Sequence, residues 1–311
     1  MLKTIAEKIG ANVASVIVGK QEITRLALTC IFSQGHILLE DVPGTGKTVL
    51  AKSIARSMDC SFKRIQFTPD LLPTDVTGLS IFNQKELSFE FKPGAVFASV
   101  VLADEINRAT PRTQSSLLEC MEERQVTVDG KTYPMARPFL VFATQNPVEI
   151  QGTFPLPEAQ LDRFMMRLKM GYTDTQGAQE ILKRFLRDDP LAKIEPVATA
   201  EEIVDAQEEV KTIHVSDAVI EYIIDLCERT RKAEQVALGV SPRGSLALMR
   251  ACQAWTAMDG RDFVTPDDVK KLAVPVLAHR IVVKGAYGRV DKSEQVVQDV
   301  LRQTPVPTEQ A

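Results

Sequence analysis

The sequence lacks the features that would direct the chain out of the cell or into a membrane. Its N-terminus, MLKTIAEKIG, has no apolar stretch followed by a small-residue cleavage site. No apolar run reaches the roughly 20 residues that a membrane-spanning helix needs. The five cysteines show no paired spacing, which argues against a disulfide framework and fits a reducing compartment. From these absences we expect a cytoplasmic protein without a membrane span.

Histidines and runs of one charge are also scarce. The three histidines, His36, His214 and His279, lie too far apart in sequence to indicate a zinc site. No long basic run occurs, and the formal net charge is -4, so strong nonspecific attraction to nucleic acid or to an anionic membrane is not expected. We therefore expect no structural metal, and the overall charge does not favour a nucleic-acid partner.

The chain has 311 residues, of which 44% are hydrophobic and 25% charged. Its hydrophobic patterns divide it into two parts. Up to residue 172, apolar strand-like runs alternate with helical patterns, which predicts a parallel sheet covered by helices. Beyond it, amphipathic helical patterns dominate. We predict an α/β domain at 1–172, a helical domain at 173–301 and a disordered tail at 302–311. The expected strands are 36–40, 62–67, 99–104, 138–144 and 164–170. The expected helices of the second domain are 174–187, 200–211, 216–232, 242–259 and 266–280.

The segment 36–48, HILLEDVPGTGKT, predicts a phosphate-binding loop between a buried strand and a helix. The predicted ATP-binding residues are Pro43, Gly44, Thr45, Gly46, Lys47, Thr48 and Val49. Lys47 would reach the β- and γ-phosphates, and the Thr48 hydroxyl would bind Mg²⁺ held between them. Asp41 stands where the consensus motif has its first glycine, and Asp tolerates turn conformations better than most residues. An ordinary glycine-rich turn with a surface lysine is the alternative.

Polar residues follow two further apolar runs. Asp104 and Glu105 end the run 99–103, and Asn146 follows the run 139–143. Ligands bind at the carboxyl ends of parallel strands, so these side chains should lie beside the phosphate loop. Asp104 would hold Mg²⁺ through its water shell, and Glu105 would polarise the attacking water. Asn146 would bond the γ-phosphate or that water, although a simple Asn-Pro turn is the alternative.

Two arginines are candidates for stabilising charge on a γ-phosphate. Arg243 lies in the first turn of a predicted helix, where the helix dipole disfavours a cation and a bound anion would relieve it. Arg163 begins the last predicted strand of the first domain, within PEAQLDRF, and nothing nearby accounts for its charge. Taken alone, each would more often be a solvated surface arginine.

Two insertions in the first domain predict β-hairpins. The segment RQVTVDGKTY (124–133) places Asp129-Gly130 between alternating residues, a strong hairpin signal. The segment LSIFNQKELSFEFK (79–92) alternates on both sides of a polar turn. Either hairpin could be surface decoration or a functional element.

Taken together, the motifs resemble those of the MoxR family of AAA+ ATPases, in the clade with a helix-2 insert and a hairpin before sensor 1. In family order they read EDVPGTGKT, LLPTDVTG, FEFKPG, VLADEINRATPRTQSSLLECMEERQVTVDG, ATQNP, LPEAQLDRF and SPRG. By this resemblance Asn146 matches sensor 1, Arg163 the arginine finger and Arg243 sensor 2. Arg108 and Arg112 are alternatives for the finger.

The resemblance also implies an AAA+ P-loop αβα domain with a five-stranded parallel sheet and a C-terminal all-helical lid. Ile17, Val18 and Gly19 match the segment that packs on adenine. ATP and Mg²⁺ would be the cofactors, and the assembly a homo-hexameric ring with ATP between subunits. MoxR proteins act as chaperone-like remodelers, often with a partner carrying a metal-binding von Willebrand factor A domain, so a protein client and metal or cofactor insertion are implied.

Two other functions compete with an ATP-driven remodeler. Related helix-2-insert proteins include replicative helicases, so a nucleic-acid motor is one alternative. Such a motor should carry Lys or Arg at its hairpin tips, whereas the tips here, 83–86 and 129–131, are nearly neutral. The other alternative is a nucleotide-controlled scaffold that does not hydrolyse ATP, against which Glu105 argues.

Overall fold

A five-stranded parallel sheet lies at the centre of the computed structural model, which describes residues 1–147, 151–285 and 290–307. Its strands are β1 (Ile37–Glu40), β2 (Phe62–Gln66), β5 (Val100–Asp104), β8 (Leu140–Gln145) and β9 (Met166–Leu168). They lie in the order β2-β5-β8-β1-β9, and every neighbouring pair is parallel. The predicted sheet is confirmed: four strands lie within their predicted ranges, and β8 runs one residue further.

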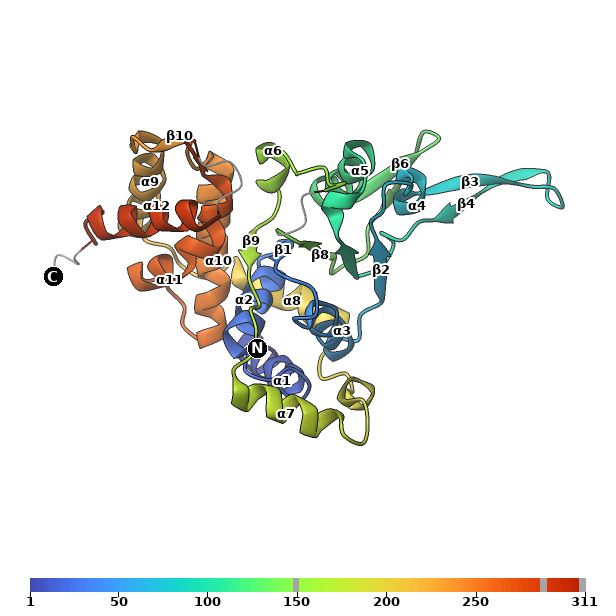
Figure 1. Cartoon of the computed structure of the whole chain (residues 1–311), viewed down its shortest axis with the longest axis horizontal. Helices are drawn as coiled ribbons and strands as arrows, with labels where there is room; N and C mark the ends of the chain where they lie inside the picture. Colours follow the sequence, from blue (N-terminus) through green and yellow to red (C-terminus); the bar gives the residue numbers. More distant parts are fainter. Residues whose placement is uncertain (148–150, 286–289, 308–311) are drawn as a thin grey trace.

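The sheet is buried on both faces, which explains its continuous apolar runs. Side chains alternate along β1, so Ile37 and Leu39 belong to one hydrophobic cluster while Leu38 belongs to the other. The first face is covered by α1 (Leu2–Ala14), α2 (Gln21–Phe32) and α3 (Lys47–Ser57). The second carries α4 (Pro73–Thr77), the 3₁₀ turn η1 (Ile106–Arg108), α5 (Pro111–Glu123) and α6 (Glu158–Leu161). This is the predicted αβα arrangement (Figure 1).

Helices dominate the rest of the chain, as predicted. They are α7 (Thr175–Phe185), η2 (Pro190–Lys193), α8 (Ala200–Val210), α9 (Asp217–Lys232), α10 (Pro242–Asp259), α11 (Pro266–Leu277), η3 (Ala278–Arg280) and α12 (Val290–Gln303). Two short strands, β10 (Val236–Leu238) and β11 (Val282–Val283), pair among them. Ser216 caps α9, and Thr265 forms a capping box with Asp268 at the start of α11. None of the described helices has the length and apolar character that crossing a membrane requires.

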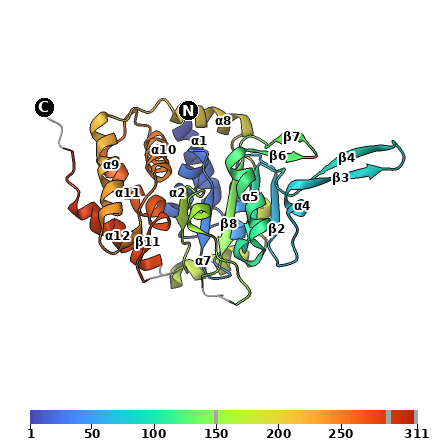
Figure 2. The same cartoon turned by 90° about the horizontal axis from the view of Figure 1, so that it is seen from above.

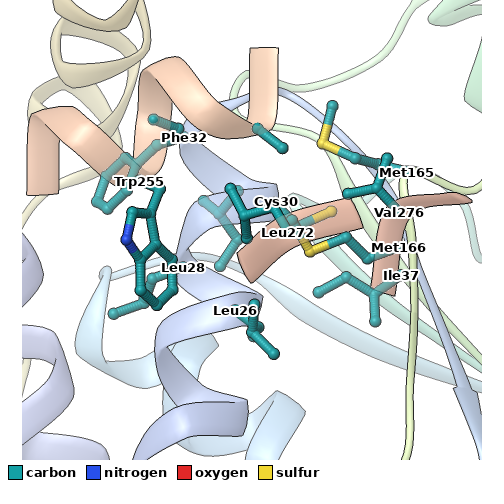
Figure 3. Packing of buried hydrophobic residues seen from close by; sticks show 14 of the residues in the cluster. Leu26, Leu28, Cys30, Phe32, Ile37, Met165, Met166, Trp255, Leu272 and Val276 are labelled. Carbon is teal, nitrogen blue, oxygen red and sulfur yellow. The ribbon is translucent and has the colours of Figure 1, made fainter. Parts of the chain in front are cut away.

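One hydrophobic cluster joins the C-terminal helices to the sheet. Figure 3 shows Trp255 of α10 and Val276 of α11 in the same packed group as Phe32 of α2, Ile37 of β1 and Met166 of β9. Because buried packing crosses residue 172, the domain limits 1–172 and 173–301 stay a prediction.

All five cysteines are free thiols.

The first residues of the predicted disordered tail, 302–311, are helical. Arg302 and Gln303 are the last residues of α12, and the buried Thr304 hydroxyl donates to the Val300 carbonyl at 2.7 Å. Helix α12 therefore extends two residues past the predicted boundary. Residues 308–311 of the predicted tail lie outside the described residues.

Both predicted hairpins are present. They are β3 (Gly78–Asn83) with β4 (Ser88–Pro93), and β6 (Gln125–Val128) with β7 (Lys131–Pro134). The β3–β4 hairpin projects from the body of the molecule, beside the shorter β6–β7 hairpin (Figure 2). At its base, Phe91 stacks on Tyr133 of β7 with 4.1 Å between ring centroids. The two hairpins therefore support each other where they leave the α/β layers.

We predict that His36, which precedes β1, makes the fold acid-sensitive. Its Nδ1 accepts from the Val141 amide at 3.0 Å, which leaves Nε2 as the donor to the Met121 carbonyl at 3.1 Å. Complete burial, followed by the charge of Arg124, lowers the pKa of His36 to about 3. The folded state thus binds fewer protons than the unfolded state below about pH 6.5, and stability falls as the pH drops from there towards 3.

The check is urea unfolding of wild type and His36→Gln between pH 7 and pH 4, with the exposed His214→Gln as control. Because His36→Gln lacks this titrating group, the slope of its unfolding free energy against pH should be smaller than that of wild type by up to about 1.4 kcal/mol per pH unit. Parallel profiles for wild type and His36→Gln would show that His36 plays no part in the acid sensitivity.

Candidate functional site

A cavity of about 500 Å³ opens at the carboxyl edge of the sheet, where β1, β5 and β8 lie side by side. Its lining residues are Pro43, Gly44, Gly46, Lys47, Thr48, Val49, Arg64, Gln66, Asp104, Glu105, Thr144, Gln145 and Asn146. Nearly all the predicted phosphate-loop residues, both acidic residues and Asn146 therefore face one space. This shared cavity is what the strand-end reasoning predicted.

The phosphate loop has the backbone that its glycines allow. Gly44 and Gly46 have φ values of +82° and +90°, which favour glycine, and α3 begins directly afterwards at Lys47. The first turn of a helix has amide groups without helical partners, so it can bind an anion. The Lys47 ammonium donates to the carbonyls of Asp41 at 2.7 Å and Val42 at 3.0 Å. Partial burial lowers the pKa of Lys47, and the nearby carboxylates of the site oppose that shift.

Asp41 has a structural reason to replace the consensus glycine. It is not among the described residues with positive φ, so the position does not demand glycine. One carboxylate oxygen accepts from the Val42 amide at 2.8 Å, and the other accepts from the Gly171 amide just beyond β9. Asp41 thereby ties the start of the phosphate loop to the chain that leaves the sheet.

Asp104 is held by two residues that the sequence analysis did not select. The Thr144 hydroxyl donates to its Oδ1 at 2.6 Å, and Arg64 donates to its Oδ2 through Nε at 3.0 Å and through a terminal nitrogen at 2.6 Å. The same Thr144 oxygen accepts from the Glu105 amide at 2.8 Å. Thr144 therefore aligns both acidic residues.

Glu105 adopts a left-handed backbone conformation, with φ +56° and ψ +50°, which is uncommon for a residue with a side chain. Strained conformations of this kind cluster at functional sites. Its Oε2 accepts from Gln66 Nε2 at 2.8 Å and pairs with Arg108 Nε at 3.1 Å. The carboxylate is thus aimed from β5 into the cavity by groups on β2 and η1.

The strand pattern of the sequence contains a signal for Arg64 and Gln66 as site residues. They occupy alternate positions in β2, and Gln66 lies directly across from Asp104 in the parallel register. Polar residues at the end of a strand next to the acidic pair should face the same edge.

The donor groups in the cavity fit a magnesium ion that is shared with phosphates. Thr48 and Asp104 both line it and offer a hydroxyl and a carboxylate, which are oxygen ligands of the kind Mg²⁺ prefers. In the described ranges, no group of three or more His, Cys, Asp or Glu side chains could hold a metal by itself. The remaining ligands would have to be phosphate oxygens and water.

The two candidate arginines lie outside this cavity. Arg243, in the first turn of α10, pairs with Glu122 near the end of α5. A protein carboxylate thus supplies the negative charge that the helix dipole favours at this end. Burial lowers the pKa of Arg243. Arg163 was expected to begin the last strand, but β9 starts at Met166, and Arg163 lies in the turn that follows α6.

The structure also gives the positions of the alternative finger arginines and of the segment that matches the adenine contact. Arg108 pairs with Glu105, whereas Arg112 is exposed in the first turn of α5. Val18 and Gly19 are not among the described residues that line the cavity. The next residue, Lys20, donates to the Tyr172 carbonyl at 3.1 Å, close to the segment that Asp41 binds.

Comparisons with known proteins agree with the geometry. Residues 36–166 match the model of the ATPase family associated with various cellular activities (AAA), and residues 228–300 match the AAA lid domain. The chain is 40% identical to chaperone MoxR1 of Mycobacterium tuberculosis over 306 residues, which cover 95% of this chain and 81% of that protein. It is 47% identical to the uncharacterized protein YeaC of Bacillus subtilis over 301 residues, covering 96% of this chain and 94% of YeaC.

Structural comparison gives the same result. A crystal structure of a candidate ATPase from Cytophaga hutchinsonii superposes with a TM-score of 0.90 and 37% identity. The match covers 99% of this chain and 96% of the other. The resemblance and fold class predicted from the motifs are confirmed.

Proposed function

Because the chain belongs to the MoxR family of AAA+ ATPases and is an ATP hydrolase, we propose that it uses ATP hydrolysis to remodel or activate partner protein complexes. Insertion of a metal or cofactor into such a complex is one form this work would take. The observation that carries the proposal is the single cavity shared by the phosphate loop, the acidic pair and Asn146.

In this proposal, Pro43 to Val49 bind the phosphates of ATP, with Lys47 on the β- and γ-phosphates. Thr48 and Asp104 hold Mg²⁺, which would neutralise charge on the phosphates. Val18 and Gly19 contact the adenine. The position of Lys20 beside Tyr172 supports this, since Met170, two residues earlier, lies next to Gly46 of the loop.

The chemical step assigned to this chain is activation of water. Glu105 orients and polarises the water that attacks the γ-phosphorus, and Asn146 bonds the γ-phosphate or that water. Gln66 and Thr144 support this role because they fix the side chain and the backbone of Glu105. Arg64 holds Asp104 in the same way.

We propose that a neighbouring subunit completes the site in a homo-hexameric ring. Neither Arg163 nor Arg243 lines the cavity of its own subunit, and the Arg163 guanidinium has no hydrogen-bond or ion-pair partner within the described part of the chain. Arg108 is the weaker finger because Glu105 already pairs with it. The domains 1–172 and 173–301 would then move relative to each other as Arg243, acting as sensor 2, gains and loses contact with phosphate.

A protein client fits the hairpins better than nucleic acid does. The β3–β4 hairpin exposes apolar side chains, with Leu87 78% and Phe89 73% accessible. Its turn carries one lysine and one glutamate, Lys85 and Glu86, so it offers no cationic track for phosphates. We propose that this hairpin contacts the client, including a protein with a von Willebrand factor A domain.

A subunit-mixing experiment tests the ring. Arg163→Ala should bind ATP normally but lose about 10³-fold or more in kcat, since an arginine supplied between subunits stabilises charge in the transition state. Adding Lys47→Ala protein, which keeps Arg163, should restore turnover in mixed rings. Steady-state ATPase assays at varied mixing ratios measure this.

Arg112→Ala serves as the comparison variant. Turnover that is not restored for Arg163→Ala but is restored for Arg112→Ala would move the finger to α5. Full activity of Arg163→Ala alone would remove Arg163 from the proposed site.

A further inference from the structure

Arg280 of η3 is a buried cation that the proposed site does not use. Its side chain is 2% exposed, and its Nε donates to Asp162 Oδ1 at 2.7 Å. The other guanidinium nitrogens donate to the carbonyls of Phe164 at 2.8 Å and Met165 at 3.2 Å. The buried guanidinium thus holds the residues on both sides of Arg163 with charge-assisted hydrogen bonds.

The same turn is bound to the first turn of α10. The Ser241 hydroxyl, which caps α10 by accepting from the Gly244 amide, donates to Asp162 Oδ2 at 2.8 Å. A Cβ placed on Gly244 would lie 2.8 Å from Arg280 Cδ, so the arginine stem packs directly on this turn. Both oxygens of Asp162 therefore join α10 and η3 to the residue before Arg163.

Asp162 and Arg163 are adjacent in sequence, but their side chains differ in how they are bound. The Asp162 side chain is held at both oxygens, and its carbonyl accepts from Arg280 at 3.3 Å. The guanidinium of Arg163, the next residue, has no such partner among the described residues. A backbone fixed to the helical region thus carries a side chain that is available to another molecule.

We propose that Asp162 is a positioning residue: through Arg280 and Ser241 it fixes Arg163 to the start of α10, so that movement of the C-terminal helices moves the arginine offered to the neighbouring subunit. This inference rests on the proposed function, because it takes Arg163 as the arginine that acts between subunits. It adds the residue that sets the position of Arg163 and the element that controls it.

The first test uses Asp162→Asn in the full-length protein. Because the residue acts on the neighbour's site, ATP affinity should stay within about twofold while kcat falls at least about tenfold, as small misplacements of catalytic groups cost that much or more. Adding Lys47→Ala protein, which has a normally placed Arg163, should restore turnover. Adding Arg163→Ala protein should not.

A residue that merely stabilised its own subunit's site would not show this rescue pattern. If Lys47→Ala restores Arg163→Ala but not Asp162→Asn, Asp162 does not act through Arg163 and the inference is wrong. If it restores neither, Arg163 does not act between subunits, and the inference falls with that part of the proposed function. Wild-type turnover by Asp162→Asn would also overturn it.

Matched serine variants decide the question if Asp162→Asn does not fold. Ser241 and Ser216 both cap a helix by accepting an amide three residues on, but Ser241 alone of the two also bonds Asp162. Ser241→Ala should lower kcat at saturating ATP by at least about threefold more than Ser216→Ala does, which corresponds to losing one hydrogen bond. Equal kcat values in the two variants would contradict the role assigned to Asp162.

Discussion

Replacing Lys47 with alanine is expected to abolish ATP binding and, with it, turnover. Lys47 lies at the first position of α3 and lines the cavity together with Thr48 and Asp104. Its ammonium already sits among the carbonyls of the loop, so it can bond phosphate oxygens with little rearrangement. Hydrogen bonds between charged groups contribute about 1.5–3 kcal/mol each, so losing two should weaken ATP binding by more than about a hundredfold.

The measurement is titration of the protein with a fluorescent ATP analogue in the presence of Mg²⁺. Lys52→Ala is the matched control, because Lys52 lies on the same helix but is not among the residues lining the cavity. Affinity near the wild-type value in Lys47→Ala, with an unchanged melting temperature, would mean that the cavity is not a phosphate site. The assignments of Thr48, Asp104 and Glu105 would fail with it.

Sequence reasoning predicted positions correctly where the residues lie close together in the chain. The glycines, Lys47 and Thr48 form a continuous motif whose turn geometry follows from residue type, and the structure gives Gly44 and Gly46 the expected positive φ. Asp104 and Asn146 were located by a rule about strand ends, which needs only that the strands be parallel neighbours. The register of β1, β5 and β8 satisfies that condition.

The missed features depend on side chains that meet across the fold. No local pattern states that Arg64 holds Asp104, or that Glu122 on α5 supplies the anion for Arg243 on α10. The role of Asp41 is of the same kind, because its second partner, Gly171, lies 130 positions away in the chain. Such contacts depend on which strands are neighbours and on how the helices pack, and residue types alone do not specify either.

Replacing Glu105 with glutamine should separate binding from hydrolysis. Glutamine keeps the size of the side chain and an oxygen that can accept from Gln66, so ATP affinity should stay within about threefold of wild type. The amide cannot polarise the attacking water as a carboxylate does, and kcat should fall about 10²–10⁴-fold. Comparing ATP titrations with single-turnover hydrolysis measures the two effects separately.

Glu119→Gln is the control for this charge change, because Glu119 is exposed on α5 and is not among the residues lining the cavity. Normal turnover in Glu105→Gln would assign activation of water to another group, despite the strained backbone that aims Glu105 into the cavity. If hydrolysis stops while ATP stays bound, the proposed ring should retain a bound client for long periods, since release would require the phosphate to leave. A protein retained with ATP by Glu105→Gln and lost with ADP would support the remodelling function, whereas salt-sensitive retention of nucleic acid in its place would contradict it.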